Sequence, residues 1–168
     1  MKSLLLLRHA KSSWKEPGLA DHDRPLAPRG RRAARRIAGH LREQGIEPGL
    51  VLCSSARRAR ETLARIESAL GSDVEVRIDD DLYGASARDL MGRVRALPEA
   101  LTSAMLIGHN PAMANLALSL AERGSDLPRI ERKFPTAALA TLEFAGSWGE
   151  LKDGGAELVA FVTPKQLR

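Results

Sequence analysis

Three short runs of apolar residues stand out along the chain, each bounded by polar or small residues. They cover residues 3–8, 50–54 and 104–107. Strands of a parallel sheet that is covered on both faces are apolar along their whole length, without alternation. The three runs therefore predict three buried strands.

Several segments outside these runs have the apolar period of amphipathic helices. Residues 28–44 show it most clearly, and Gly45 after them is a typical helix stop. The apolar positions of this segment are Ala33, Ala34, Ile37, Ala38 and Leu41. Further helices are predicted at about residues 56–70, 86–97 and 111–123.

The remaining apolar residues predict strands with one exposed face. Residues 73–78 alternate apolar and polar positions, with Val74, Val76 and Ile78 on one face. Residues 137–144 and 157–163 are predicted to complete the chain as two strands that could pair as a hairpin. Strands that alternate with helices predict an α/β fold: a three-layer α/β/α sandwich with a mostly parallel central sheet, in one domain of residues 1–168.

Composition excludes some classes of protein. Cys53 is the only cysteine, so no intrachain disulfide can form, and its apolar surroundings favour burial. The leucines at 4–7 are too few for the apolar region of a signal peptide, and no stretch approaches the roughly 20 apolar residues of a membrane span. We expect a cytoplasmic monomer without membrane association. The formal net charge of +5 permits anionic partners without choosing among them.

Candidate chemistry gathers where the three buried strands end. The first ends in Arg8 and His9, and the second in residues 54–55, followed by arginines at 57, 58 and 60. The third ends in Gly108 and His109. Because the carboxyl ends of parallel strands lie on one edge of a sheet, two histidines and several arginines are expected to converge there.

These groups suit a phosphate. Arginine offers a planar fork of donors that stays charged, and a neutral imidazole nitrogen can attack phosphorus and carry the phosphoryl group. Asn110 is a typical N-cap before Pro111, so the amides at that helix start would face the same anion, and Asn110 is a candidate substrate-binding residue. Arginines can neutralise the charge of phosphoryl transfer, so we expect neither a metal ion nor another cofactor.

At these residues the sequence resembles the histidine phosphatase superfamily, the clan that includes cofactor-dependent phosphoglycerate mutase. Within the clan it is most similar to the short phosphohistidine phosphatases of the SixA type. The resemblance rests on Leu-Arg-His-Ala-Lys-Ser (7–12), Asp-Arg-Pro-Leu-Ala-Pro-Arg-Gly (23–30), Cys-Ser-Ser-Ala-Arg-Arg-Ala-Arg-Glu-Thr-Leu (53–63), Leu-Tyr (82–83) and Gly-His-Asn-Pro (108–111).

The resemblance implies a role for each matching residue. His9 would be the phosphorylated nucleophile, Arg8 would bind the phosphate, and His109 would be the second histidine that holds the transferring group. The spacing of the family's second motif selects Arg58 over its neighbours as the other phosphate-binding arginine. Ser12 stands where many members have a serine or threonine near the phosphate.

Two positions depart from the family pattern. Ala10 replaces the usual glycine, and the region where many members carry a glutamate general acid reads Asp-Asp-Asp-Leu-Tyr-Gly (79–84). Asp81 is the candidate acid there, although acidic residues before a loop are more often solvated. Since the imidazole of a phosphohistidine leaves phosphorus more readily than an alkoxide does, a missing acid fits a phosphohistidine-bearing protein as the substrate and partner.

Other functions remain open at this point. A phosphatase of small phosphomonoesters would use the same residues, whereas a mutase would need a more enclosed site. A nucleic-acid-binding protein is suggested by the arginines of residues 29–42, although no aromatic residues interleave with them to stack bases. A phosphate-binding protein without turnover is the remaining alternative.

Overall fold

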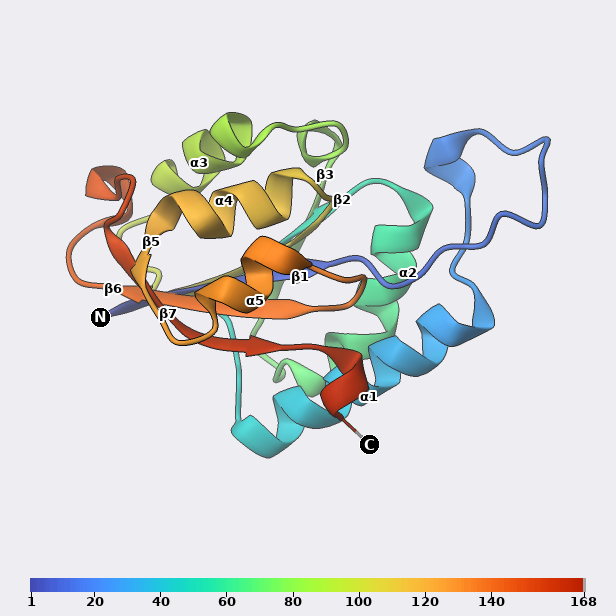
Figure 1. The fold of residues 1–168 in the computed structure, drawn as a ribbon, viewed down its shortest axis with the longest axis horizontal. Coiled ribbons are helices and arrows are strands. Elements are labelled where there is room, and N and C mark those ends of the chain that lie inside the picture. The colour runs from blue at the N-terminus through green and yellow to red at the C-terminus, as the bar shows by residue number, and fades with distance from the viewer. Residues whose placement is uncertain (168) are drawn as a thin grey trace.

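The computed structural model describes residues 1–167, and its strands form one seven-stranded sheet (Figure 1). The order across the sheet is β3-β2-β4-β1-β6-β7-β5. Neighbouring strands pair in parallel except that β6 runs antiparallel to both β1 and β7. The strands are β1 (Lys2–Arg8), β2 (Leu50–Ser54), β3 (Glu75–Asp79), β4 (Ser103–Gly108), β5 (Ala121–Arg123), β6 (Leu139–Phe144) and β7 (Ala156–Val162). The predicted mostly parallel sheet is confirmed, and so is the hairpin of the last two strands.

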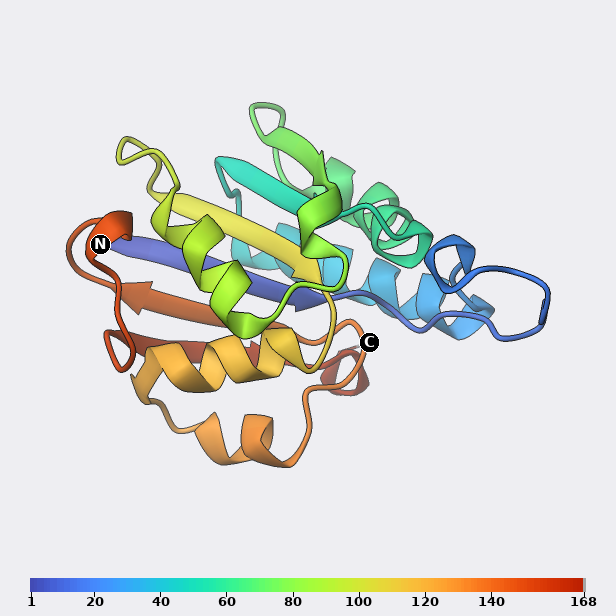
Figure 2. The same cartoon turned by 90° about the horizontal axis from the view of Figure 1, so that it is seen from above.

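Helices cover both faces of the sheet and complete the predicted three layers (Figure 2). On one face lie α1 (Pro28–Gln44) and α2 (Arg57–Ile66). On the other lie α3 (Ala87–Arg95), α4 (Ala112–Leu120) and α5 (Leu127–Arg132). Within residues 1–167, no helix has the length and apolar character needed to cross a membrane.

The buried strands supply both apolar layers because successive side chains point to opposite faces. In β1, Leu4 and Leu6 pack toward α3 and α4, whereas Leu5 and Leu7 pack toward α1 and α2. Cys53 lies in the second layer and is fully buried, as its apolar surroundings predicted. A strand that must contribute to two cores has no polar face, which explains the continuous apolar runs.

Helix α1 has the predicted limits. Pro28 occupies its first turn, and Gly45 ends it in the left-handed conformation at φ 62°. Of the apolar positions that define its face, Ala34, Ile37 and Leu41 are fully buried. The arginines suggested for nucleic-acid binding lie mainly on the opposite, exposed side of the helix.

The half-buried strand predicted at residues 73–78 is present as β3, although Ile78 near its end is 50 % exposed on this edge strand of the sheet. One predicted helix boundary is wrong. The predicted helix 111–123 ends at Leu120, since residues 121–123 pair with β7 as β5. Neither this strand nor the following α5 was predicted from the sequence.

Candidate active site

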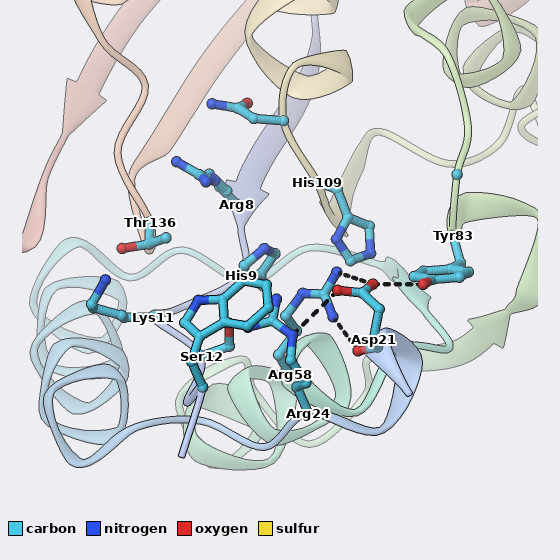
Figure 3. Close-up of a pocket in the computed structure, with 13 residues that line it drawn as sticks. Arg8, His9, Lys11, Ser12, Asp21, Arg24, Arg58, Tyr83, His109 and Thr136 are labelled. Carbon is cyan, nitrogen blue, oxygen red and sulfur yellow. Dashed lines mark hydrogen bonds and ion pairs between the residues drawn. The ribbon is translucent and has the colours of Figure 1, made fainter. Parts of the chain in front are cut away.

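The ends of β2, β4 and β1 lie side by side, as the sequence predicted. Arg8 pairs with Gly108 across the two parallel strands, so the residues that follow them emerge together. The rings of His9 and His109 are 5.1 Å apart between centroids. Both histidines line one cavity of about 530 Å³ at this edge of the sheet (Figure 3).

The cavity also contains most of the other residues selected from the sequence. Arg8, Ser12, Arg58 and Asn110 line it, whereas the exposed Asp81 does not. The full lining comprises Arg8, His9, Lys11, Ser12, Trp14, Asp21, Arg24, Arg58, Tyr83, Gly84, His109, Asn110 and Thr136. Six of these come from the loop between β1 and α1, residues 9–27, which projects from this edge of the sheet (Figure 1).

His9 has one ring nitrogen fixed and one left for chemistry. Its side chain is buried, and Nδ1 lies 2.7 Å from the carbonyl oxygen of Ala10. A carbonyl only accepts, so Nδ1 carries the proton and the neutral ring keeps its lone pair on Nε2. Burial, together with the nearby His109 and Arg58, lowers the pKa of His9 to about 3 despite the opposing hydrogen bond to Ala10. The ring is therefore neutral at pH 7.

His109 is held by a buried serine that sequence reasoning placed at the strand end without a role. Its Nε2 lies 2.7 Å from Ser54 Oγ, which also accepts a hydrogen bond from the Ala56 amide. If Ser54 donates to Nε2, the ring proton lies on Nδ1 and is free to be donated to a bound anion. Burial first, and then the charge of Arg58, lower the pKa of His109 to about 4.

A turn before β6 fixes Arg8 and Asn110. The Phe134 carbonyl accepts hydrogen bonds from Arg8 Nη1 at 3.0 Å and from Asn110 Nδ2 at 2.8 Å. In the same turn, the Ala137 amide donates to the carbonyls of Arg8 and His9, and Ala137 adopts a left-handed φ of 61°. A non-glycine residue holds this conformation only where its surroundings enforce it. The turn thus holds the backbone on both sides of His9.

The start of α4 differs from the prediction that Asn110 is the N-cap. The helix begins at Ala112 with Pro111 as its N-cap, and Asn110 Oδ1 instead accepts from the Ala114 amide. The Met113 amide donates to the His109 carbonyl. Because these amides already have partners, they are not free to face an anion, and the arginine side chains are the main donors to the cavity.

Arg58 differs from its neighbours in burial and in partners. The residue is only 6 % exposed, and Nη1 and Nη2 donate to the backbone carbonyl and the carboxylate of Asp21 at 2.8 and 3.1 Å. Arg57 is exposed and pairs with Glu61, while Arg60 donates to the Ser55 carbonyl. Of these three arginines, only Arg58 lines the cavity.

Two guanidinium donors in the cavity wall remain unsatisfied. Among residues 1–167, the Nε atoms of Arg8 and Arg58 are the buried side-chain nitrogens or oxygens without a hydrogen-bond partner. Buried polar groups rarely lack partners in native proteins, so holding these two arginines in place costs stability. Both side chains line the cavity, and their guanidinium charges suit a phosphate.

Asp21 is one of the residues of this site that sequence reasoning missed. Its carboxylate accepts from Tyr83 Oη at 2.6 Å, from Arg58, and from Arg24 Nε at 3.2 Å (Figure 3). These bonds, with that of Tyr83 largest, lower its pKa to about 2. The carboxylate that reaches the cavity is thus ionised at neutral pH. Asp21 lies in a loop without periodicity, so no pattern indicated its position.

We expect neither His9 nor His109 to gain a proton between pH 8 and pH 5, because the pKa of each lies at or below about 4. The unfolded chain, with histidine pKa values near ~6.5, binds more protons in this range. The free energy of unfolding should therefore fall by about 2 kcal/mol for each of the two histidines, or roughly 4 kcal/mol together, from pH 7 to pH 5. NMR of the histidine rings and urea unfolding at each pH measure both effects. Titration of either ring near pH 6.5 would contradict this account.

Comparison with known proteins gives consistent matches over the chain. The model of the histidine phosphatase superfamily (branch 1) matches residues 4–106. The uncharacterised Mycobacterium tuberculosis protein Rv1276c is 41 % identical over 163 residues, which are 95 % of this chain and all of that protein.

Two solved structures are similar in both sequence and fold. The protein from Nakamurella multipartitia, provisionally named phosphohistidine phosphatase SixA, has a TM-score of 0.83 and 32 % identity, covering 97 % of this chain and 96 % of its own. Its counterpart from Agrobacterium tumefaciens, named in the same provisional way, has a TM-score of 0.84 and 31 % identity, covering 97 % and 98 %.

Proposed function

This chain belongs to the histidine phosphatase superfamily, and on that premise we propose that it transfers a phosphoryl group from a phosphohistidine-bearing protein to His9 and then to water. The observation that carries the proposal is the state of His9: a neutral imidazole whose Nδ1 is fixed by the Ala10 carbonyl and whose Nε2 keeps its lone pair. A nucleophilic histidine needs this tautomer, in a cavity that neutralises phosphate charge.

In the first step, Nε2 of His9 forms a bond to phosphorus while the bond from phosphorus to the leaving nitrogen breaks. The leaving imidazole keeps the electron pair and takes a proton from solvent. Arg8 and Arg58 bind the phosphoryl oxygens with charged donors, and His109 donates the proton on its Nδ1 to the same group. Ser12 and Asn110 complete the binding residues in this proposal.

In the second step, a water molecule attacks phosphorus and the electron pair of the phosphorus–nitrogen bond returns to Nε2 of His9. Inorganic phosphate leaves and the enzyme regains its neutral histidine. The ring can act again at once because burial keeps its pKa at about 3.

The proposed substrate follows from the carboxylates near the site. Asp21 is held ionised and Asp81 lies outside the cavity lining, so among residues 1–167 the cavity lining offers no protonated carboxyl for a leaving alkoxide. A phosphoramidate needs such an acid less, because its nitrogen is protonated readily by solvent. The provisional names of the two similar structures favour the same substrate class.

A comparison of substrates tests this proposal. We expect kcat/KM for a phosphohistidine-bearing protein to exceed that for alkyl phosphomonoesters such as sugar phosphates by about 100-fold or more, the usual contribution of a general acid. The measurement is phosphate release at neutral pH with each substrate. Equal or faster hydrolysis of the phosphomonoesters would replace the proposed substrate with that class.

A further inference from the structure

The few aromatic residues of this chain are divided between the core and the cavity. The chain has three phenylalanines, two tryptophans and one tyrosine. The phenylalanines and Trp148 are buried in the core, whereas Trp14 and Tyr83 line the cavity. Tyr83 has an evident task there, since its hydroxyl donates to Asp21. Trp14 is 74 % exposed and contributes little to the core.

Trp14 is nevertheless held in place. The guanidinium carbon of Arg24 lies 3.5 Å from the centre of its ring system, which is close stacking of a cation on an aromatic face. Arg24 itself is only 8 % exposed, and it donates to the Asp21 carboxylate and to the Ser13 carbonyl. A buried, doubly anchored side chain thus covers one face of an indole whose surface is otherwise largely free.

The loop that carries Trp14 is also braced. Ser12 and Leu26 form an isolated antiparallel β-bridge, and the Ser13 amide donates to the Pro25 carbonyl at 2.8 Å. The same Asp21 that anchors Arg24 also binds Arg58. Trp14 is therefore connected to the phosphate-binding arginine through Arg24 and Asp21. A single exposed apolar side chain is ordinary on a protein surface, but one fixed in this way at the cavity is placed for contact with a ligand.

We propose that Trp14 is a specificity residue that stacks against a planar part of the substrate next to its phosphoryl group. This inference rests on the proposed function, in which the planar part is the imidazole ring of phosphohistidine. Aromatic stacking suits this task because it recognises a flat group without requiring a particular set of hydrogen bonds.

Three substrates test the inference: a phosphohistidine-bearing peptide, phenyl phosphate, and phosphoramidate, which has a phosphorus–nitrogen bond but no ring. Trp14→Ala should lower kcat/KM for the two planar substrates about tenfold, mainly through a higher KM, as expected for loss of one stacking contact. Hydrolysis of phosphoramidate should change less than about twofold, because the groups that contact phosphate are untouched. Trp14→Phe should retain most of the wild-type kcat/KM for the two planar substrates.

Lys15→Ala is the matched control, because Lys15 is an exposed neighbour in the same loop and does not line the cavity. It should leave all three activities unchanged. An equal loss of all three activities in Trp14→Ala would assign Trp14 a structural role, and no loss would remove it from recognition, so either result overturns the inference. If the wild-type protein hydrolyses phenyl phosphate but not the peptide, the proposed substrate fails, while selective loss of phenyl phosphate hydrolysis in Trp14→Ala still supports stacking.

Discussion

Replacing His9 with alanine is expected to reduce phosphatase activity by about 10⁴-fold or more, because it removes the atom that receives the phosphoryl group. The fold should persist, since the ring lines a cavity and its hydrogen bond is to the neighbouring Ala10 carbonyl. The measurement is phosphate release by wild-type and variant proteins at neutral pH, with circular dichroism to compare their folding.

His40→Ala is the matched control for this experiment. His40 lies on α1 and does not line the cavity, so its loss should leave activity unchanged. Full turnover by His9→Ala would exclude the covalent mechanism. A protein that binds phosphate without turnover would instead show no activity in the wild type either.

Arg58→Ala is expected to lower kcat by about 100- to 1000-fold, the usual cost of losing a preorganised charged donor to a transition state. Arg57→Ala, one residue away, should leave kcat nearly unchanged. Arg57 is exposed and pairs with Glu61 on the same helix, a contact worth about 0.3–0.5 kcal/mol of stability. Steady-state kinetics and thermal unfolding of both variants make the comparison.

Arg58→Lys separates loss of charge from loss of geometry. It keeps the positive charge but not the planar fork that donates to two Asp21 oxygens. We therefore expect its kcat to stay well below that of the wild type. Near-normal activity in Arg58→Ala together with a large loss in Arg57→Ala would show that the second motif had been aligned one residue out of position.

The convergence of the two histidines could be predicted from the sequence because it depends on the parallel arrangement of the buried strands. Apolar runs such as Leu4–Leu7 are long enough to identify buried strands, and parallel strands place their ends together. His9 and His109 then follow as neighbours in space although 100 positions separate them in the chain.

The choice of Arg58 came from the family motif, but helix geometry explains it. Arg58, Thr62 and Ile66 recur every four residues and are all buried on one face of α2, so Arg58 projects inward where Arg57 and Arg60 cannot. Thr62 reinforces the position, since its hydroxyl accepts from the Ala10 amide and donates to the Arg58 carbonyl.

Other parts of the site depend on contacts that no local pattern encodes. Asp21 reaches the cavity through a loop, and its partners Arg58 and Tyr83 are distant in sequence. β5 exists because β7 supplies its hydrogen-bond partners, although its residues also fit a helix. In each case tertiary pairing decides the local structure.

The most direct test of the account is to identify the residue that carries phosphate during turnover. The protein is mixed with a labile phosphodonor, quenched in base and analysed by peptide mass spectrometry. We expect an acid-labile, base-stable phosphoryl group on His9 in the wild type, and its absence in His9→Ala. Turnover by the wild type without this adduct, or an adduct on His109, would contradict it.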